Sequence, residues 1–149
     1  MFPLRTLVPG PVDLIACMGD TLTHLDGIAQ VRSLVAEATA LVVPAGVLIL
    51  SWRDLTRLPE GDARFLPIRS SPEHLFTCFL ETVDATCVRV HDIVHERAGD
   101  GFSQRVSSYL KLRISPEMVD AELTACGLEI DRATAERGWI TRVARRPAP

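Results

Sequence analysis

VDLIACMGDTLTHL, residues 12–25, opens the stretch that decides the fold. Residues 12–17 form a short apolar run between a proline and a glycine, a pattern typical of a strand buried on both faces in a parallel sheet. From Gly27 to about Leu41, apolar residues recur at helical spacing with polar residues between them. This part of the chain therefore predicts a strand that leads into an amphipathic helix.

LVVPAGVLILSWRDL, residues 41–55, supplies the next strand. The segment Pro44-Ala45-Gly46 is expected to break the chain. Val47 to Trp52 then has the pattern of a second buried strand, and it ends in the charged pair Arg53-Asp54. Strand, helix and strand together predict one βαβ unit with parallel strands.

The middle of the chain has a different pattern, in which apolar and polar residues alternate as they do in antiparallel strands. The alternating segments are residues 65–69, 77–83, 87–97 and 102–113. The third and fourth segments are joined by Ala98-Gly99-Asp100-Gly101. A short link rich in Gly and Asp between alternating runs predicts a β-hairpin.

A second helix is expected after this region, because Ser115-Pro116-Glu117 places a capping Ser before a Pro at the first helical position. Gly127 would end this helix. Its inward face would consist of Met118, Val119, Leu123 and Cys126. Two strand-like segments, 128–132 and 139–144, come next. The basic side chains at the end are expected to belong to a solvated tail: Arg142, Arg145 and Arg146.

The composition of the 149-residue chain, with 47% apolar and 23% charged residues, predicts one globular domain with its own core. A net charge of -3 and no basic stripe argue against a nucleic-acid partner. The four cysteines lack CxxC or zinc spacing, which favours a reducing cytoplasmic compartment. No apolar stretch is long enough to span a bilayer, so we expect no membrane partner.

The segment CMGDTLTHL, from Cys17 to Leu25, carries a resemblance to a known family. It is similar to the loop C-x-G-(N/D)-(S/T)-x-x-H-L that follows the fourth strand of class I S-adenosylmethionine-dependent methyltransferases. In these enzymes a Pro-x-Gly turn precedes the fifth strand, and Pro44-Ala45-Gly46 lies at the matching place. From Val12 onward the chain resembles the C-terminal half of such an enzyme, most closely the glycine N-methyltransferase-like branch.

The resemblance implies an α/β fold, with a partial Rossmann-like methyltransferase sheet made of the C-terminal strands 4 to 7 and an inserted antiparallel β-hairpin region. It implies a single, truncated domain over residues 1–149. In the family the N-terminal half carries the glycine-rich cofactor loop, and no GxGxxG-type turn precedes Val12. We therefore expect a methyltransferase-like chain that is incomplete as an independent enzyme.

The resemblance also implies a site for S-adenosylmethionine. Cys17, Met18 and Gly19 would line the methionine end of this cofactor, and Gly19 would permit close approach to the backbone. Asp20 and Thr21 would supply polar contacts to the methyl acceptor. A strand-to-helix turn with Asp20 or Thr21 as the helix cap explains the same residues.

Three further residues are candidate contacts of the methyl acceptor. By resemblance, Arg53 would clamp a carboxylate, because a guanidinium can donate two parallel hydrogen bonds to it. The alternative for Arg53 is an ion pair with Asp54 or a solvated charge. His24 is a candidate proton acceptor or a helix-packing residue, and Tyr109 is either an acceptor contact or a packing residue of a half-buried strand.

Histidine and cysteine residues elsewhere suggest no further chemistry. His91 and His95 would share one strand face with Arg89, which repels cations, and no third ligand has suitable spacing, so no metal site is expected. Cys17 and Cys126 are expected to be small buried residues without a nucleophilic role.

The strands missing from the family pattern have a consequence for association. Residues 12–17 would form an unpaired apolar edge, which is a template for pairing with another chain. The mean hydropathy of +0.17 agrees with a surface that needs a partner. We expect a homodimer or a complementing N-terminal half. The predicted function is N-methylation of a small, amino-acid-like acceptor, and the alternative is a catalytically inactive α/β module for binding or self-association.

Overall fold

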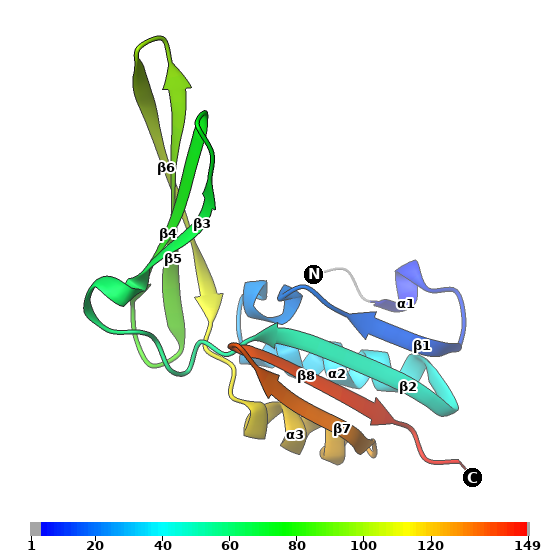
Figure 1. Ribbon diagram of the computed structural model, residues 1–149. Helices are drawn as coiled ribbons and strands as arrows, with labels where there is room; N and C mark the ends of the chain where they lie inside the picture. The colour runs from blue at the N-terminus through cyan, green and yellow to red at the C-terminus, as the bar shows by residue number, and fades with distance from the viewer. Residues whose placement is uncertain (1–3, 149) are drawn as a thin grey trace. The chain divides into compact units, whose positions relative to one another are not determined.

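The computed structural model describes residues 4–148 (Figure 1). It divides into two compact units, which are described separately. We call the unit formed by residues up to Leu55 and from Ile114 onward the sheet unit, and the unit from Thr56 to Arg113 the hairpin unit.

The sheet unit is built on a four-stranded sheet with the order β1-β2-β8-β7. Strands β1 and β2 are parallel, and the other neighbours are antiparallel. Helices α2 and α3 lie on the same face of this sheet (Figure 1). The elements are α1 (Leu4–Leu7), β1 (Val12–Cys17), the short 3₁₀ turn η1 (Thr21–His24), α2 (Ile28–Leu41), β2 (Val42–Arg53), α3 (Pro116–Ala125), β7 (Glu129–Glu136) and β8 (Trp139–Arg145).

The βαβ unit predicted from the sequence is confirmed, because β1, α2 and β2 follow one another and the two strands pair in parallel. The apolar faces of the helices and sheet meet in a hydrophobic core. Its largest fully buried side chains include Trp52, Leu48, Leu50, Val31, Val35, Val119 and Leu123. Burial of such side chains is the main favourable contribution to folding.

The prediction that Pro44-Ala45-Gly46 breaks the chain is wrong, since β2 begins at Val42 and runs through these residues. Ala45 adopts a left-handed φ of 65°, and its N–H donates to the carbonyl of Arg146 at 2.9 Å. A Cβ at Gly46 would lie 2.9 Å from the carbonyl oxygen of Asp13. The irregular segment is therefore a kink inside a continuous strand, and glycine is required because β1 passes so close.

The prediction that β1 is buried on both faces is also wrong. The side chain of Leu14 is 55% exposed, and Ala16 is exposed as well. Ile15 and Cys17 point to the other face and are half-buried. The difference arises because helices cover one face of the sheet only (Figure 1).

Helix α3 begins as predicted, because Ser115 Oγ accepts a hydrogen bond from the N–H of Met118 at 3.2 Å and Pro116 occupies the first turn. The helix ends before Gly127, whose φ of +81° lies in the left-handed region. On its inward face Val119 and Leu123 are fully buried, while Met118 and Cys126 are half-buried.

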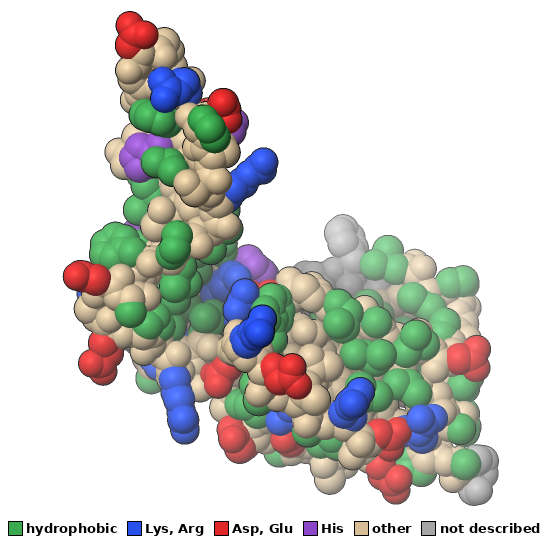
Figure 2. Space-filling view, in the orientation of Figure 1, with side chains coloured by type: hydrophobic (Ala, Val, Ile, Leu, Met, Phe, Trp, Pro, Cys, Tyr) green, Lys and Arg blue, Asp and Glu red, His purple; other side chains and the backbone are tan. Residues whose placement is uncertain are grey.

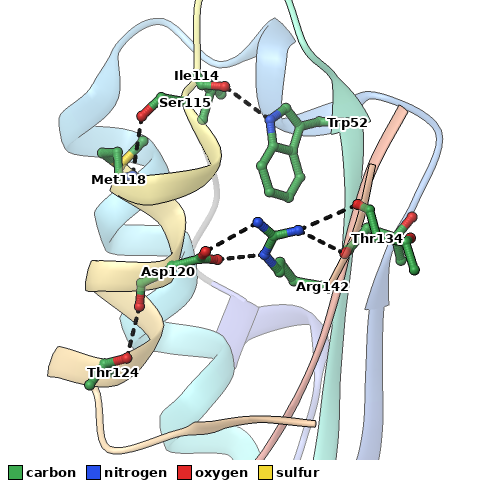
Figure 3. A network of polar contacts seen from close by, with 9 residues as sticks. Trp52, Ile114, Ser115, Met118, Asp120, Thr124, Thr134 and Arg142 are labelled. Atoms are coloured by element: carbon green, nitrogen blue, oxygen red, sulfur yellow. Dashed lines mark hydrogen bonds and ion pairs between the residues drawn. The ribbon is translucent and has the colours of Figure 1, made fainter. Parts of the chain in front are cut away.

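The expectation that the last arginines form a solvated tail is wrong for Arg142, which is buried on β8. Its guanidinium forms two hydrogen bonds with the Asp120 carboxylate, of which Nη2 to Oδ2 measures 3.1 Å (Figure 3). Nearby, the indole N–H of Trp52 donates to the carbonyl of Ile114 at 3.1 Å (Figure 3). Arg146 Nη1 donates to the carbonyl of Val42 at 2.7 Å. These contacts fasten β8, α3 and β2 together.

The hairpin unit contains an antiparallel sheet of order β3-β4-β5-β6, which confirms the alternating segments predicted from the sequence. The β5–β6 connection is the predicted hairpin, with Gly99 at a φ of +58°. The elements are the 3₁₀ turn η2 (Gly61–Arg64), β3 (Phe65–Ser70), β4 (His74–Thr82), β5 (Cys87–Ala98) and β6 (Gly101–Leu112).

No helix within residues 4–148 is long and apolar enough to cross a membrane.

Candidate functional site

The candidate site is the loop that follows β1, at the carboxyl end of a parallel strand where open α/β sheets bind ligands. Gly19 and Asp20 both adopt a φ of 74°, in the left-handed region. Two successive left-handed residues turn the chain sharply out of the strand and into η1. Glycine accepts this conformation freely, whereas an aspartate in it needs support from its surroundings.

Asp20 receives that support from the end of β2. Its side chain is buried, with 5% exposure, and Oδ1 accepts a hydrogen bond from the backbone N–H of Arg53 at 2.8 Å. The N–H of Asp20 points to the carbonyl of Ser51 at 3.4 Å. The carboxylate therefore joins the carboxyl ends of β1 and β2, and it makes no side-chain capping bond to η1.

Two buried side chains hold the turn η1 against the rest of the sheet unit. Leu22 and Thr23 are fully buried, and Thr23 Oγ1 donates to the carbonyl of Asp20 at 3.0 Å. Thr21 is exposed, and its hydroxyl donates to the carbonyl of Met18 at 3.0 Å. His24, the last residue of η1, is exposed. The loop is thus a firmly held turn whose exposed members are Met18, Gly19, Thr21 and His24.

The residues expected at the cofactor differ in accessibility. Met18 is 51% exposed, and the space where a Gly19 side chain would begin holds no atom within 4 Å. Burial raises the pKa of the Cys17 thiol above its usual range, and a hydrogen bond with Thr21 opposes this only partly. A raised pKa disfavours the thiolate, which is the nucleophilic form of cysteine.

Arg53 lies at the carboxyl end of β2, opposite Trp139 in the antiparallel register with β8. Its guanidinium carbon is 4.3 Å from the centroid of the Trp139 ring, and Nη1 donates to the carbonyl of Arg137 at 3.4 Å. Stacking on indole holds a guanidinium in one plane while its edge can still donate hydrogen bonds. The structure therefore brings Arg53 to the same end of the sheet as the loop after β1.

Sequence reasoning missed Trp139 as part of this site. The pairing of Arg53 with Trp139 joins residues 86 positions apart and depends on the β2–β8 register. The local signal in the sequence was a glycine, Gly138, directly before this aromatic residue, which is typical of a turn.

Tyr109 belongs to the hairpin unit. It lies on β6, is half-buried, and has the Lys111 ammonium 5.9 Å from its ring centroid. These observations describe a residue of the strand surface, so its role at the acceptor stays a prediction.

His91, in the hairpin unit, has both charged and aromatic neighbours. His91 Nε2 is 2.8 Å from Glu81 Oε2, and Arg89 Nε is 3.5 Å from the same oxygen. The His91 ring also lies 5.7 Å from the ring of Phe79. Within residues 4–148, no group of three or more His, Cys, Asp or Glu side chains could hold a metal ion.

Comparison with known proteins identifies the fold of the chain. No family model matches the chain, and no curated protein matches it. Among solved structures, it is similar to an amino pentose methyltransferase from Micromonospora echinaspora that binds S-adenosylmethionine, with 21% identity and a TM-score of 0.77, over 93% of this chain and 60% of that one.

Two further solved structures agree. One is an S-adenosylmethionine-dependent methyltransferase from Clostridium acetobutylicum, with 14% identity and a TM-score of 0.73, over 95% of this chain and 61% of that one. The other is a sugar N-methyltransferase from a Streptoalloteichus species, with 14% identity and a TM-score of 0.69, over 93% and 57%. The chain has the fold of these enzymes and spans about three fifths of their length.

Proposed function

We propose that this chain forms the acceptor-binding part of an S-adenosylmethionine-dependent N-methyltransferase for small-molecule amines. The observation that carries the proposal is the Asp20–Arg53 connection, which joins the loop after β1 to the end of β2. Carboxyl ends of parallel strands are where open α/β sheets bind their ligands. Neighbours of the same fold act on an amino pentose and on a sugar nitrogen, which supports transfer to an amine.

The residues present fit part of a cofactor site. The backbone at Gly19 is left-handed and has open space beside it, so a ligand can approach where a side chain would otherwise stand. Met18 is exposed beside it and offers an apolar, adaptable surface. When bound, S-adenosylmethionine supplies a methyl group on a positively charged sulfur. The chain's own contribution is to position the acceptor and exclude water.

The polar residues of the loop have proposed roles toward the methyl acceptor. The amine must lose a proton when its nitrogen gains the methyl group, and His24 is the candidate proton acceptor because it is exposed in the loop and a neutral imidazole has a nitrogen that can accept a proton. Thr21 offers an exposed hydroxyl in the same loop. Asp20 acts as a positioning residue, since its carboxylate is already engaged by the Arg53 N–H.

Arg53 would select an acceptor that carries a carboxylate, which is the amino-acid-like acceptor typical of the glycine N-methyltransferase-like branch. Its guanidinium is held by the Trp139 ring, and a guanidinium makes paired, charge-assisted hydrogen bonds to carboxylates. Replacing Arg53 by Gln should weaken binding of glycine about tenfold or more and leave binding of ethylamine unchanged. Equal effects on both amines would exclude the carboxylate clamp.

The test of the proposed function is calorimetric titration of the purified chain with S-adenosylmethionine and S-adenosylhomocysteine up to millimolar concentration, with the mass in solution determined in parallel. Saturable binding supports the proposal. Absence of binding up to millimolar concentration would contradict it and favour the alternative of a catalytically inactive binding or self-association module.

A further inference from the structure

The hairpin unit has an open pocket with a volume of about 320 Å³, which lies within the size range of sites for small molecules. Its wall comes from three places in the chain: the segment that ends in η2, the last residue of β4 and the residue after β6. All of these residues belong to the hairpin unit, so the pocket shares no residue with the candidate site in the sheet unit. The side chains that line it are Leu58, Pro59, Glu60, Arg64, Thr82 and Arg113.

Arg113 is held by backbone carbonyl groups of two separate segments. Its Nη1 donates to the carbonyl of Asp84 at 3.0 Å, and its Nη2 donates to the carbonyl of Thr56 at 2.8 Å. Carbonyl oxygens orient a guanidinium but carry no formal charge, and a guanidinium has five N–H donors. The Asp84 carboxylate is engaged in its own turn, where Oδ1 accepts from the N–H groups of Thr86 and Cys87 at 2.6 and 2.8 Å. Arg113 is therefore a cation with a fixed orientation at the pocket.

Arg64 is held in a comparable way. Its Nε donates to the carbonyl of Gly61 at 3.3 Å, and its guanidinium carbon lies 5.1 Å from the centroid of the Phe79 ring. An aromatic face holds a guanidinium in one plane and leaves its edge able to donate hydrogen bonds to a carboxylate or a phosphate. The pocket therefore has two guanidinium groups whose positions are set before any ligand binds.

The excess of positive charge is local to the pocket. The hairpin unit as a whole has eight Lys and Arg residues and eight Asp and Glu residues. Figure 2 shows basic and acidic side chains scattered over this unit and not gathered into one basic surface. Among the described side chains that line the pocket, two guanidinium groups stand against one carboxylate, that of the exposed Glu60. An anion should therefore be attracted to the pocket and not to the unit in general.

We propose that this pocket binds a small molecule that carries a carboxylate or phosphate group, whose anionic oxygens accept hydrogen bonds from Arg64 and Arg113. Such oxygens match the planar donor fork of a guanidinium. Leu58 and Pro59 offer apolar contacts to the body of the ligand, and Thr82 offers an exposed hydroxyl. The ligand is therefore an organic acid or a phosphate ester and not a bare ion. The inference does not rest on the proposed function.

The experiment is an amide-resolved NMR titration of the full chain with phenyl phosphate and with benzoate, at constant ionic strength. Benzyl alcohol, which has a similar size and no charge, is the neutral control. The variant is Arg64→Gln, and its matched control is Arg97→Gln. Arg97 lies outside the pocket lining but repeats the contacts of Arg64, because its Nε donates to the carbonyl of Pro72 at 3.3 Å and its guanidinium carbon lies 5.1 Å from the centroid of the Phe102 ring.

We expect saturable shifts of the amides of Gly61, Thr82 and Arg113 with at least one of the two anions, and none with benzyl alcohol. Arg64→Gln should weaken this binding about tenfold or more, because it removes a charge-assisted donor, whereas Arg97→Gln should change it less than about twofold. Binding of phenyl phosphate alone would identify the ligand as a phosphate ester, and binding of benzoate alone would identify it as an organic acid.

A second variant, Glu60→Gln, keeps the proposal falsifiable if Arg64→Gln fails to fold, because Glu60 is exposed. It should strengthen anion binding about threefold, since it removes a negative charge from the pocket. Weaker binding in Glu60→Gln, equal binding by Arg64→Gln and the unaltered chain, equal shifts with benzyl alcohol, or no saturable shift of these amides would overturn the proposal. The amides of Arg53 and Trp139 report carboxylate binding at the candidate site in the same spectra, so failure of the proposed function is seen separately.

Discussion

The carboxylate of Asp20 accepts a hydrogen bond from the backbone N–H of Arg53 at 2.8 Å, although 33 positions separate them. Through this bond the loop after β1 and the end of β2 form one rigid rim at the sheet's carboxyl edge. The same rim carries the exposed Gly19 and the Arg53 guanidinium that stacks on Trp139. The Asp20 side chain therefore contributes both to the stability of the fold and to the geometry of the candidate site.

Asp20→Ala should destabilise the chain. It removes a hydrogen bond to a charged acceptor and leaves the Arg53 N–H without that partner, and such bonds contribute about 1.5–3 kcal/mol. The free energy of unfolding in urea measures the loss. Asp13→Ala, at an exposed residue of β1, is the control and should change stability by less than about 0.5 kcal/mol. Equal losses for both variants would show that the Asp20 bond contributes little.

Arg142→Met should cost about 1.5–3 kcal/mol, because it removes the two charge-assisted hydrogen bonds to the Asp120 carboxylate, whose side chain is 35% exposed and keeps part of its hydration. The double variant with Asp120→Leu should recover much of that loss. The ion pair Arg32–Glu122 serves as comparison, because the Arg32 side chain is 60% exposed, and Arg32→Ala should cost no more than about 1 kcal/mol. Additive losses in the Arg142–Asp120 double-mutant cycle would mean that the two side chains do not interact.

Gly46→Ala should disturb the β1–β2 pairing. A Cβ there would lie 2.9 Å from two backbone oxygens, those of Asp13 and Val43, which cannot move aside as a flexible side chain would. We expect a loss of about 1–3 kcal/mol and faster amide exchange along β1. Gly10→Ala is the matched control, because nothing lies within 4 Å of its added Cβ. Unchanged exchange in Gly46→Ala would contradict the close approach of the two strands.

Cys78 should react slowly with iodoacetamide. Burial, with a contribution from the 3.0 Å hydrogen bond to Asp92 Oδ1, raises the pKa of its thiol to about 12. The thiolate fraction, and with it the labelling rate, should therefore still rise about tenfold per pH unit between about pH 8 and pH 10. Asp92→Asn should speed labelling at the lower pH, while Asp100→Asn in the hairpin turn should not. A rate that levels off near about pH 9 in the unaltered chain would disprove the raised pKa.

Much of the fold could be predicted from local patterns. The bounds of β1, the βαβ unit, the Ser115 cap and the β5–β6 hairpin each depend on residues within a few positions of one another. The predictions that were wrong depend on contacts between residues far apart in the sequence. Gly46 is fixed by Asp13 on another strand, and Arg142 is buried because Asp120 of α3 neutralises it.

Part of the candidate site could likewise be predicted from a local pattern, and part could not. The loop from Cys17 to His24 is contiguous, so its motif could be seen in the sequence. The connection of Asp20 to Arg53 and the stacking on Trp139 depend on the register of three strands, which no local pattern specifies. Tyr109 lies in the hairpin unit, and its contact with the acceptor stays a prediction.

The measurement that tests the central claim most directly is an amide-resolved NMR titration of the chain with S-adenosylhomocysteine, comparing Gly19→Val with Gly127→Val. Both glycines are left-handed, with φ of +74° and +81°, and both have open space around an added Cβ, so the backbone strain is matched. We expect the amides of Gly19, Thr21 and Arg53 to shift in the unaltered chain and in Gly127→Val, and these shifts to disappear in Gly19→Val. Shifts that persist in Gly19→Val, or that avoid the loop after β1, would contradict a cofactor site there.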